Sequence, residues 1–74
     1  MKEPEDLALA AVGRLIRGEG IERVSEDACI ALALALEEYA RQITRKAKDY
    51  STHAKRKTIK LDDIELALKD FKIK

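Results

Sequence analysis

The sequence has little of the chemistry that usually stabilises a small domain. It is 74 residues long and contains one cysteine, Cys29, so no disulfide can form within the chain. With a single histidine, His53, it also lacks the Cys/His cluster of a structural metal site, and we expect no metal and no cofactor. A chain of this length buries only roughly 60% of the surface that its unfolded state exposes. Association with a second chain is the remaining source of stability.

Signals that would direct the protein out of the cytosol are missing as well. The apolar stretch within residues 1–20 is too short and too charged for a membrane span or a signal peptide. A single thiol fits a reducing compartment. We therefore expect a cytoplasmic protein without membrane contact.

Neither charge sign is in clear excess, because 15 Lys and Arg residues stand against 14 Asp and Glu residues. Taken alone, this balance argues against nucleic acid as a partner. The distribution argues the other way, since the net charge is −5 over residues 1–40, +7 over residues 41–60 and −1 over residues 61–74. A local concentration of basic charge is what contact with a polyanion needs. A solvated basic helix face is the alternative, and the charge count does not choose between them.

Helix signals divide the chain into three parts. Pro4, followed by two acidic residues, is typical of a first helical turn, and Gly18 ends that helix, which we place at about residues 4–17. Ser25 is an N-cap signal, and no glycine or proline follows it. The second helix is therefore predicted at about residues 26–54.

This second helix carries an apolar stripe with steps of three and four residues, typical of a helix that packs against other helices. At 1.5 Å per residue it would be about 43 Å long, too long to be covered by two short helices of the same chain. Its centre is expected to cross a copy of itself. The stripe consists of Cys29, Ala33, Leu36, Ala40, Ile43, Ala47, Tyr50 and Ala54.

The basic run 54–60 breaks this periodicity, and a last helix is predicted at about residues 61–71 with two acids in its first turn. The chain is thus predicted to be all-α, a single domain over residues 1–74 with a short, a long and a short helix.

Two segments resemble archaeal histones, which have the histone fold. GRLIRGEGIERVSEDA is similar to the stretch that ends their first helix and begins their second, and HAKRKTIKLDDIELALKDFK is similar to their second loop and third helix. Both align without a gap at a matching separation, and the likeness covers about residues 12–72. The resemblance implies a histone fold in which two chains clasp antiparallel as a handshake dimer.

It also implies contacts with double-stranded DNA. In the family an arginine at the position of Arg23 enters the minor groove, beside the partner's Lys57 and Thr58. A guanidinium suits a narrow minor groove because it is weakly hydrated and multidentate. Taken alone, Arg23 is an ordinary surface arginine. None of these groups reads a base edge, so binding is expected to be sequence-independent. The implied DNA-binding residues are Arg14, Arg23, Lys55, Lys57, Thr58 and Lys60.

Three further roles follow from the resemblance. Arg56 and Asp63 are expected to form a salt bridge that fixes the second loop; two independent solvated charges are the alternative. Tyr50, His53 and Asp63 match positions where two dimers meet, and protonation of His53 would favour that contact. Gly20 supplies backbone freedom in a turn, and the matching family glycine lets stacked turns of a histone–DNA superhelix approach closely.

The chain departs from the family pattern at its N-terminal end. A proline usually comes shortly before the pair that matches Gly13 and Arg14, and it is absent here, so we expect the first helix to begin near Pro4. Cys29, expected to be a buried small hydrophobe, and Leu34 stand where charged or polar residues are common. Asp70 replaces a basic residue.

The expected function is sequence-independent binding, wrapping and compaction of duplex DNA by dimers, at the chromosome in the nucleoid. Partners are DNA, the chain itself as a homodimer or larger assembly, and a homologous histone. An interaction subunit of a transcription-type heterodimer is the alternative. An enzyme is rejected, because no nucleophile–base pair, phosphate loop or metal cluster is found.

Overall fold

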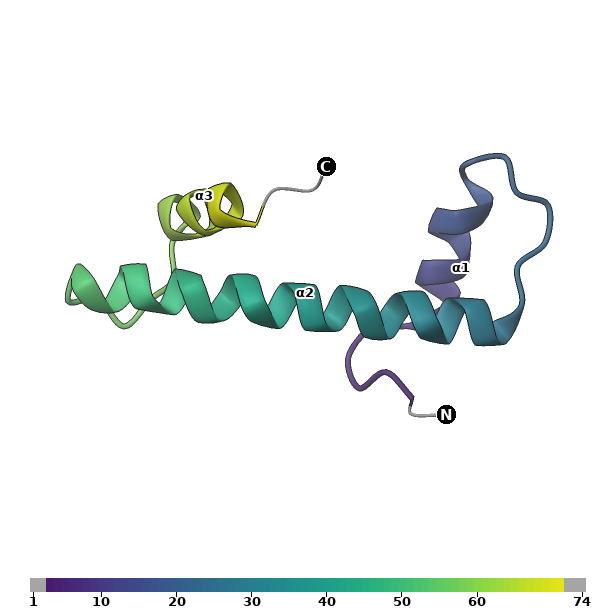
Figure 1. Ribbon diagram of the computed structural model, residues 1–74, viewed down its shortest axis with the longest axis horizontal. Helices are drawn as coiled ribbons and strands as arrows, with labels where there is room; N and C mark the ends of the chain where they lie inside the picture. The colour runs from purple at the N-terminus through teal and green to yellow at the C-terminus, as the bar shows by residue number, and fades with distance from the viewer. Residues whose placement is uncertain (1–2, 72–74) are drawn as a thin grey trace. The chain divides into compact units, whose positions relative to one another are not determined.

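The computed structural model describes residues 3–71, which form three helices and no strand (Figure 1). The helices are α1 (Leu9–Arg17), α2 (Glu26–His53) and α3 (Leu61–Asp70). The predicted all-α, short–long–short order is confirmed, and α2 and α3 each end one residue before their predicted limits. None of these helices is both long enough and apolar enough to cross a membrane. The parts of the predicted domain at residues 1, 2 and 72–74 lie outside the described residues.

The prediction that the first helix begins near Pro4 is wrong. Helix α1 begins at Leu9, and Ala8 before it has an extended backbone with φ −73° and ψ 128°. Residues 5–7 form a bend instead of a first helical turn.

A buried carboxylate on α2 accounts for this bend. Glu37, a residue that is only 5% exposed, accepts three backbone N–H bonds from the segment. The donors are Glu5 at 3.2 Å, Asp6 at 2.7 Å and Leu7 at 2.8 Å. A carboxylate out of water needs such donors, and these three bonds hold residues 5–7 in the bend that the structure shows. The segment therefore lies as a strap held by Glu37.

The described chain consists of two compact units, divided within α2 between Glu38 and Tyr39. In the first unit, α1 packs on the N-terminal half of α2 through Val12, Cys29 and Ala33, all buried. Leu9, Ile16 and Val24 pack around them. The prediction that Cys29 is a buried apolar residue is confirmed, since it is 7% exposed and unpaired with another cysteine.

The two ends of the connection between α1 and α2 have clear local causes. Gly20 has a φ of +90°, which L side chains rarely adopt, as the turn prediction requires. Ser25 accepts a hydrogen bond from the backbone N–H of Ala28 at 3.1 Å through its hydroxyl oxygen, so the predicted N-cap is confirmed.

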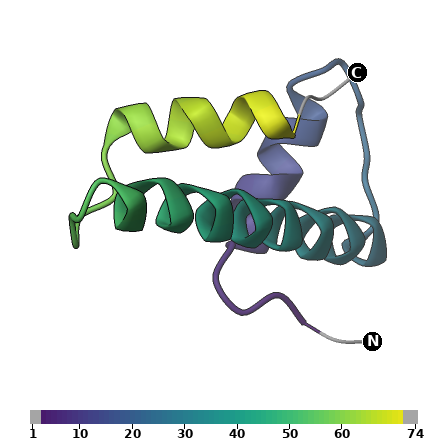
Figure 2. The same ribbon diagram turned by 60° about the vertical axis from the view of Figure 1, so that its left-hand side comes forward.

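In the second unit, α3 packs alongside the C-terminal half of α2 (Figure 2). Ala47 and Ala67 are both fully buried, and their small side chains let the two helices approach closely. Ile43 completes the buried cluster, around which Tyr39, Tyr50, Ile64 and Phe71 pack.

The apolar stripe of α2 is buried at four of its positions, two in each unit. Cys29 and Ala33 are buried in the first unit, and Ile43 and Ala47 in the second. Between them Leu36 is half-buried and Ala40 is exposed. These two residues, at the middle of the helix, are where the sequence predicts contact with a second copy.

We predict that Glu37→Gln destabilises the protein by about 1–3 kcal/mol, because a neutral amide is a weaker acceptor and brings two donors towards three N–H groups. Thermal unfolding by circular dichroism at fixed protein concentration measures the loss, and amide hydrogen exchange at Glu5, Asp6 and Leu7 should accelerate. The exposed Glu65→Gln is the control. Unchanged exchange at these three amides would show that the strap does not depend on the Glu37 charge.

Candidate nucleic-acid interface

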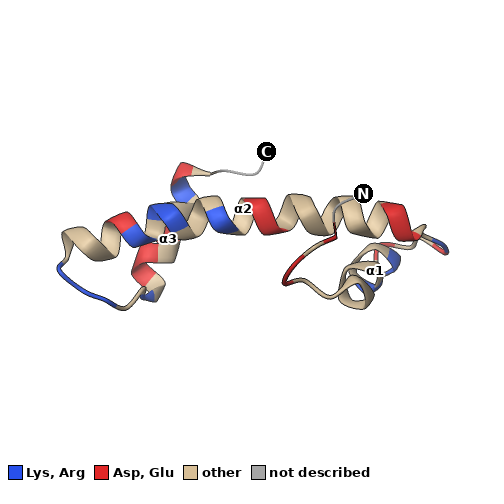
Figure 3. Ribbon diagram, turned by 90° about the horizontal axis from the view of Figure 1, so that it is seen from below, with Lys and Arg blue, Asp and Glu red and all other residues tan. Residues whose placement is uncertain are grey.

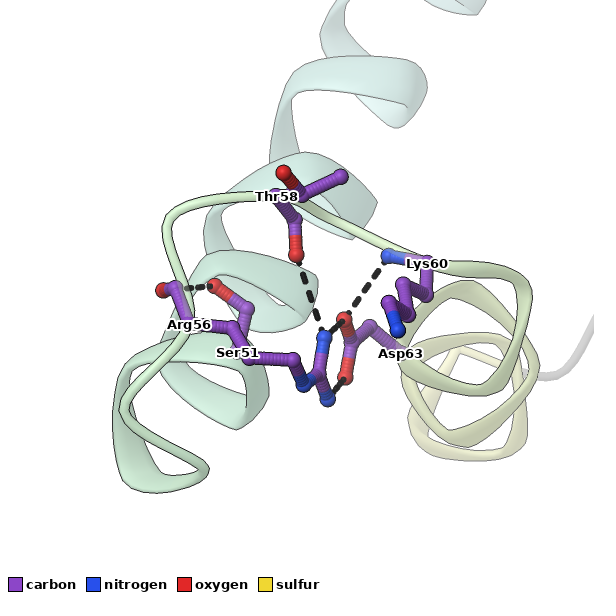
Figure 4. A network of polar contacts seen from close by, with 5 residues as sticks. All are labelled: Ser51, Arg56, Thr58, Lys60 and Asp63. Carbon is purple, nitrogen blue, oxygen red and sulfur yellow. Dashed lines mark hydrogen bonds and ion pairs between the residues drawn. The ribbon is translucent and has the colours of Figure 1, made fainter.

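The loop between α2 and α3 is organised by one ion pair (Figure 4). Arg56 donates from Nη1 to Oδ2 of Asp63 at 2.8 Å and from Nη2 to Oδ1 at 2.9 Å. Nη1 also donates to the backbone carbonyl oxygen of Thr58 at 3.1 Å. The pair predicted from the sequence is present, and two independent solvated charges are ruled out for this structure. A bidentate pair fixes direction as well as distance.

Asp63 is the buried partner of this pair, with 2% of its surface exposed. Its Oδ2 also accepts the backbone N–H of Lys60 at 2.9 Å, the residue before α3. The hydrogen bonds from Arg56 and then from Lys60 lower the pKa of Asp63 from 3.8 to about 2, against the opposing effect of desolvation. One carboxylate thus holds both the loop and the first turn of α3.

The end of α2 places Arg56 for this contact. The backbone N–H of Lys55 donates to the carbonyl of Thr52, and the N–H of Arg56 donates to the carbonyl of Ser51, both at 2.9 Å. The buried Ser51 hydroxyl also lies 3.4 Å from the Arg56 carbonyl oxygen, to which it donates. These bonds turn the chain sharply after His53 and direct the Arg56 guanidinium towards α3.

The remaining predicted DNA-binding residues of this loop are exposed. Lys55, Lys57, Thr58 and Lys60 all have solvent-accessible side chains, and the basic run 55–57 forms a continuous blue stretch in Figure 3. Arg56 is the exception, with its side chain 30% exposed and its charge paired. The loop therefore presents lysines to solvent around an arginine that is turned inward.

Arg14 and Arg23 belong to the other unit. Both are exposed, Arg14 on α1 and Arg23 in the connection between α1 and α2. Along the chain, the 28 residues of α2 separate Arg23 from the second loop. Gly20, three residues before Arg23, is exposed too, and an added Cβ would find nothing within 4 Å. Its backbone conformation, not crowding within the chain, is what favours glycine.

The three residues predicted for contact between dimers have different surroundings in the chain. His53 is exposed at the last position of α2. Tyr50 donates its hydroxyl to Oδ2 of Asp70 at 2.9 Å, which raises the Tyr50 pKa. Asp63 is engaged with Arg56 and Lys60. The structure describes a single chain, so the contact between dimers stays a prediction.

Sequence reasoning missed the contacts of Asp70. Besides accepting from Tyr50, Asp70 lies 3.9 Å from the Lys46 ammonium, which is 5.7 Å from the centre of the Tyr50 ring. The sequence showed that Asp70 stands where the family has a basic residue. It did not show that Asp70 accepts a hydrogen bond from Tyr50, because Tyr50 lies on α2 and Asp70 on α3.

Comparison with known proteins decides the family. The model of a family described as histone-like transcription factors (CBF/NF-Y) and archaeal histones matches residues 5–68. The chain belongs to this family.

Two archaeal histones are close in sequence along nearly their whole length. The chain is 53% identical over 64 residues to one of the subunits of archaeal histone HAN1 from Thermococcus zilligii. It is 45% identical over 64 residues to probable archaeal histone 3 of Methanocaldococcus jannaschii. Each alignment covers 86% of this chain and 96% of the relative. Histone H4 of Encephalitozoon cuniculi is 37% identical over 70 residues, which are 95% of this chain and 68% of that protein.

Membership in this family confirms the predicted histone fold. Histone-fold chains of this family pair in a handshake dimer, and archaeal histones bind and compact DNA as dimers or larger assemblies, with homologous histones as partners. The chain is accordingly a chromosome-associated, structural DNA-binding protein of histone type.

We predict that the stability supplied by Asp63 depends on pH in a defined direction. Its folded-state pKa of about 2 lies below the unfolded value of 3.8, so its contribution is complete above about pH 4 and is lost as pH falls towards 2. Asp63→Asn should therefore lower Tm by at least about 4 °C at pH 6, the shift expected when one internal hydrogen bond is removed from a domain of this size.

The difference in Tm between wild type and Asp63→Asn should shrink towards pH 2. Circular dichroism melts at pH 2, 3, 4 and 6, at one protein concentration, measure it. The exposed neighbour variant Asp62→Asn serves as the control. A difference that stays constant across this range would contradict the assignment of the shift to Asp63.

Proposed function

We propose that the chain binds and wraps duplex DNA without sequence preference, through a surface that only the handshake dimer completes. The single observation that carries this proposal is the second loop, in which Arg56 is fixed inward while its basic neighbours are exposed. Such a loop offers positive charge and backbone N–H groups to phosphates but presents no pattern of donors and acceptors built for base edges.

The handshake supplies the second half of the surface. In an antiparallel dimer the connection that holds Arg23 lies beside the partner's second loop, so Arg23 from one chain and Lys57 and Thr58 from the other form one site. We assign Arg23 to the minor groove, where a guanidinium is favoured over an ammonium. Lys55, Lys60 and Arg14 are assigned to phosphates.

The chain acts as an architectural protein and not as an enzyme, since its histone family and its exposed basic loop account for its role without catalysis. It is located in the cytoplasm, bound to the chromosomal DNA of the nucleoid. Gly20, exposed and with open space at its Cβ position, is assigned to the close approach of successive turns of a histone–DNA superhelix.

A second candidate function is that of a protein-interaction subunit. It is supported by the family description, which includes histone-like transcription factors, and by the near-neutral net charge of +1. The molar mass of the purified chain discriminates between the two. A stable homodimer favours the DNA-wrapping protein, whereas a monomer or an aggregate favours an obligate partner that is missing.

DNA binding should weaken steeply with salt, because each phosphate contact contributes about −0.9 to the slope of log affinity against log salt concentration. Arg23→Gln and Lys57→Gln should each make the slope shallower by about 0.9 for every phosphate contact that the substitution removes from the dimer. Fluorescence anisotropy with a duplex of mixed sequence measures the slope, and Lys48→Gln, exposed on α2, is the matched control.

Nuclease digestion of reconstituted complexes tests the wrapping itself. A ladder of regularly increasing protected lengths is expected for stacked dimers, and a single short footprint for isolated ones. Absence of protection, or affinity equal to wild type after charge reversal at both Arg23 and Lys57, would refute the proposal.

The assignment of Tyr50, His53 and Asp63 to the contact between dimers predicts a smaller assembly for His53→Ala. His53 is exposed at the last position of α2, where a second dimer can contact its side chain. Sedimentation velocity of the protein, free and bound to DNA, should show fewer species above the dimer. Thr52→Ala, one residue earlier on α2 and exposed, is the control; an unchanged size distribution for His53→Ala would remove His53 from this contact.

A further inference from the structure

One lysine of the second loop has a backbone conformation that lysine disfavours. Lys55 has a φ of +58°, and it is the one non-glycine residue with positive φ among residues 3–71. In this left-handed region the Cβ of an L-residue comes too close to the following carbonyl oxygen, and only glycine adopts it without penalty. The conformation of Lys55 therefore lowers the stability of the folded protein, and it persists only because the surrounding structure holds it.

The hydrogen bonds at the end of α2 show why the backbone must turn there. The pair Lys55 N–H to Thr52 carbonyl and Arg56 N–H to Ser51 carbonyl is the double closure that ends many helices. In this closure the residue after the cap is left-handed and is most often glycine. Lys55 occupies that position. The turn also directs Arg56 to Asp63, so it cannot be relaxed without loss of the loop brace.

The charge of Lys55 has a use that glycine could not supply. Its side chain is exposed at the start of the basic run 55–57, in which Arg56 is paired with Asp63 and so contributes little free charge. Lys55 and Lys57 are therefore the cations that flank this inward arginine. A glycine at residue 55 would leave the turn intact and remove one of the two.

We propose that Lys55 is a DNA-phosphate contact retained at a helix-ending position where glycine would give a more stable protein. This inference rests on the proposed function, and it adds that at residue 55 stability and DNA affinity oppose each other. At residue 55 a single substitution, Lys55→Gly, should raise the stability of the protein and lower its affinity for DNA.

Two substitutions of Lys55 distinguish the effect of its backbone conformation from the effect of its charge. Lys55→Gly removes the charge and relieves the left-handed strain, whereas Lys55→Gln removes the charge and keeps the Cβ. We expect Lys55→Gly to raise Tm by several degrees and Lys55→Gln to leave Tm at or below that of wild type, because it also removes a cation from the negative end of α2. Circular dichroism melts at one protein concentration, without DNA, give this comparison.

DNA binding should respond to the charge alone. In the anisotropy titration, both variants should make the salt slope shallower by about 0.9 for each phosphate contact that is removed, and to the same extent. Lys48→Gln is the control for loss of a lysine elsewhere. The inference is overturned if Lys55→Gly is no more stable than wild type, or if either variant keeps the wild-type slope.

The same titration keeps the two proposals distinguishable. If Arg23→Gln and Lys57→Gln weaken binding but the two variants at residue 55 do not, this inference fails and the proposed function stands. If none of the four changes the slope, the proposed function fails with it.

Discussion

The bidentate pair between Arg56 and Asp63 is the interaction on which the second unit depends. It joins the end of α2 to the first turn of α3, since Asp63 also accepts the backbone N–H of Lys60. Removing either partner would leave a charged group with too few partners and would free the loop between the helices. The packing of Ala47 against Ala67 holds the two helices together, but it does not define the path of the chain between them.

Because of this pair, the positive charges of the loop have two different roles: Arg56 stabilises the loop, and the exposed lysines remain available for DNA. Arg56 is the residue that a charge count would assign first to DNA, because it is the one arginine in the basic run 55–57. Its guanidinium is occupied by Asp63 and the Thr58 carbonyl, so the lysines on either side are the groups free to meet phosphates. Formal charge therefore overstates what the loop offers to a polyanion. The histone fold uses one cation to hold the others in place.

Much of this architecture follows from local signals in the sequence. The helices, the Ser25 cap, the positive φ of Gly20 and burial of Cys29 all depend on short-range chemistry or periodicity. Features that depend on distant residues were not predictable in the same way. Pro4 and two acids gave a sound signal for a helix start, but Glu37, 30–32 residues away, holds that segment as a strap. The Tyr50–Asp70 bond likewise joins two helices. The left-handed Lys55 was hidden because lysine gives no sign of that conformation.

The strap held by Glu37 has a consequence for how the protein behaves in concentrated electrolyte. Its carboxylate is nearly buried and faces fixed backbone N–H dipoles, and Asp63 is buried against Arg56 in the same manner. Mobile ions screen such enclosed interactions much less than they screen exposed lysines. The internal electrostatics of the fold and its external electrostatics towards DNA thus respond to different ranges of ionic strength. Raising the salt should strip the polyanion from a protein that stays folded, which is the condition for a packaging protein to be released and used again.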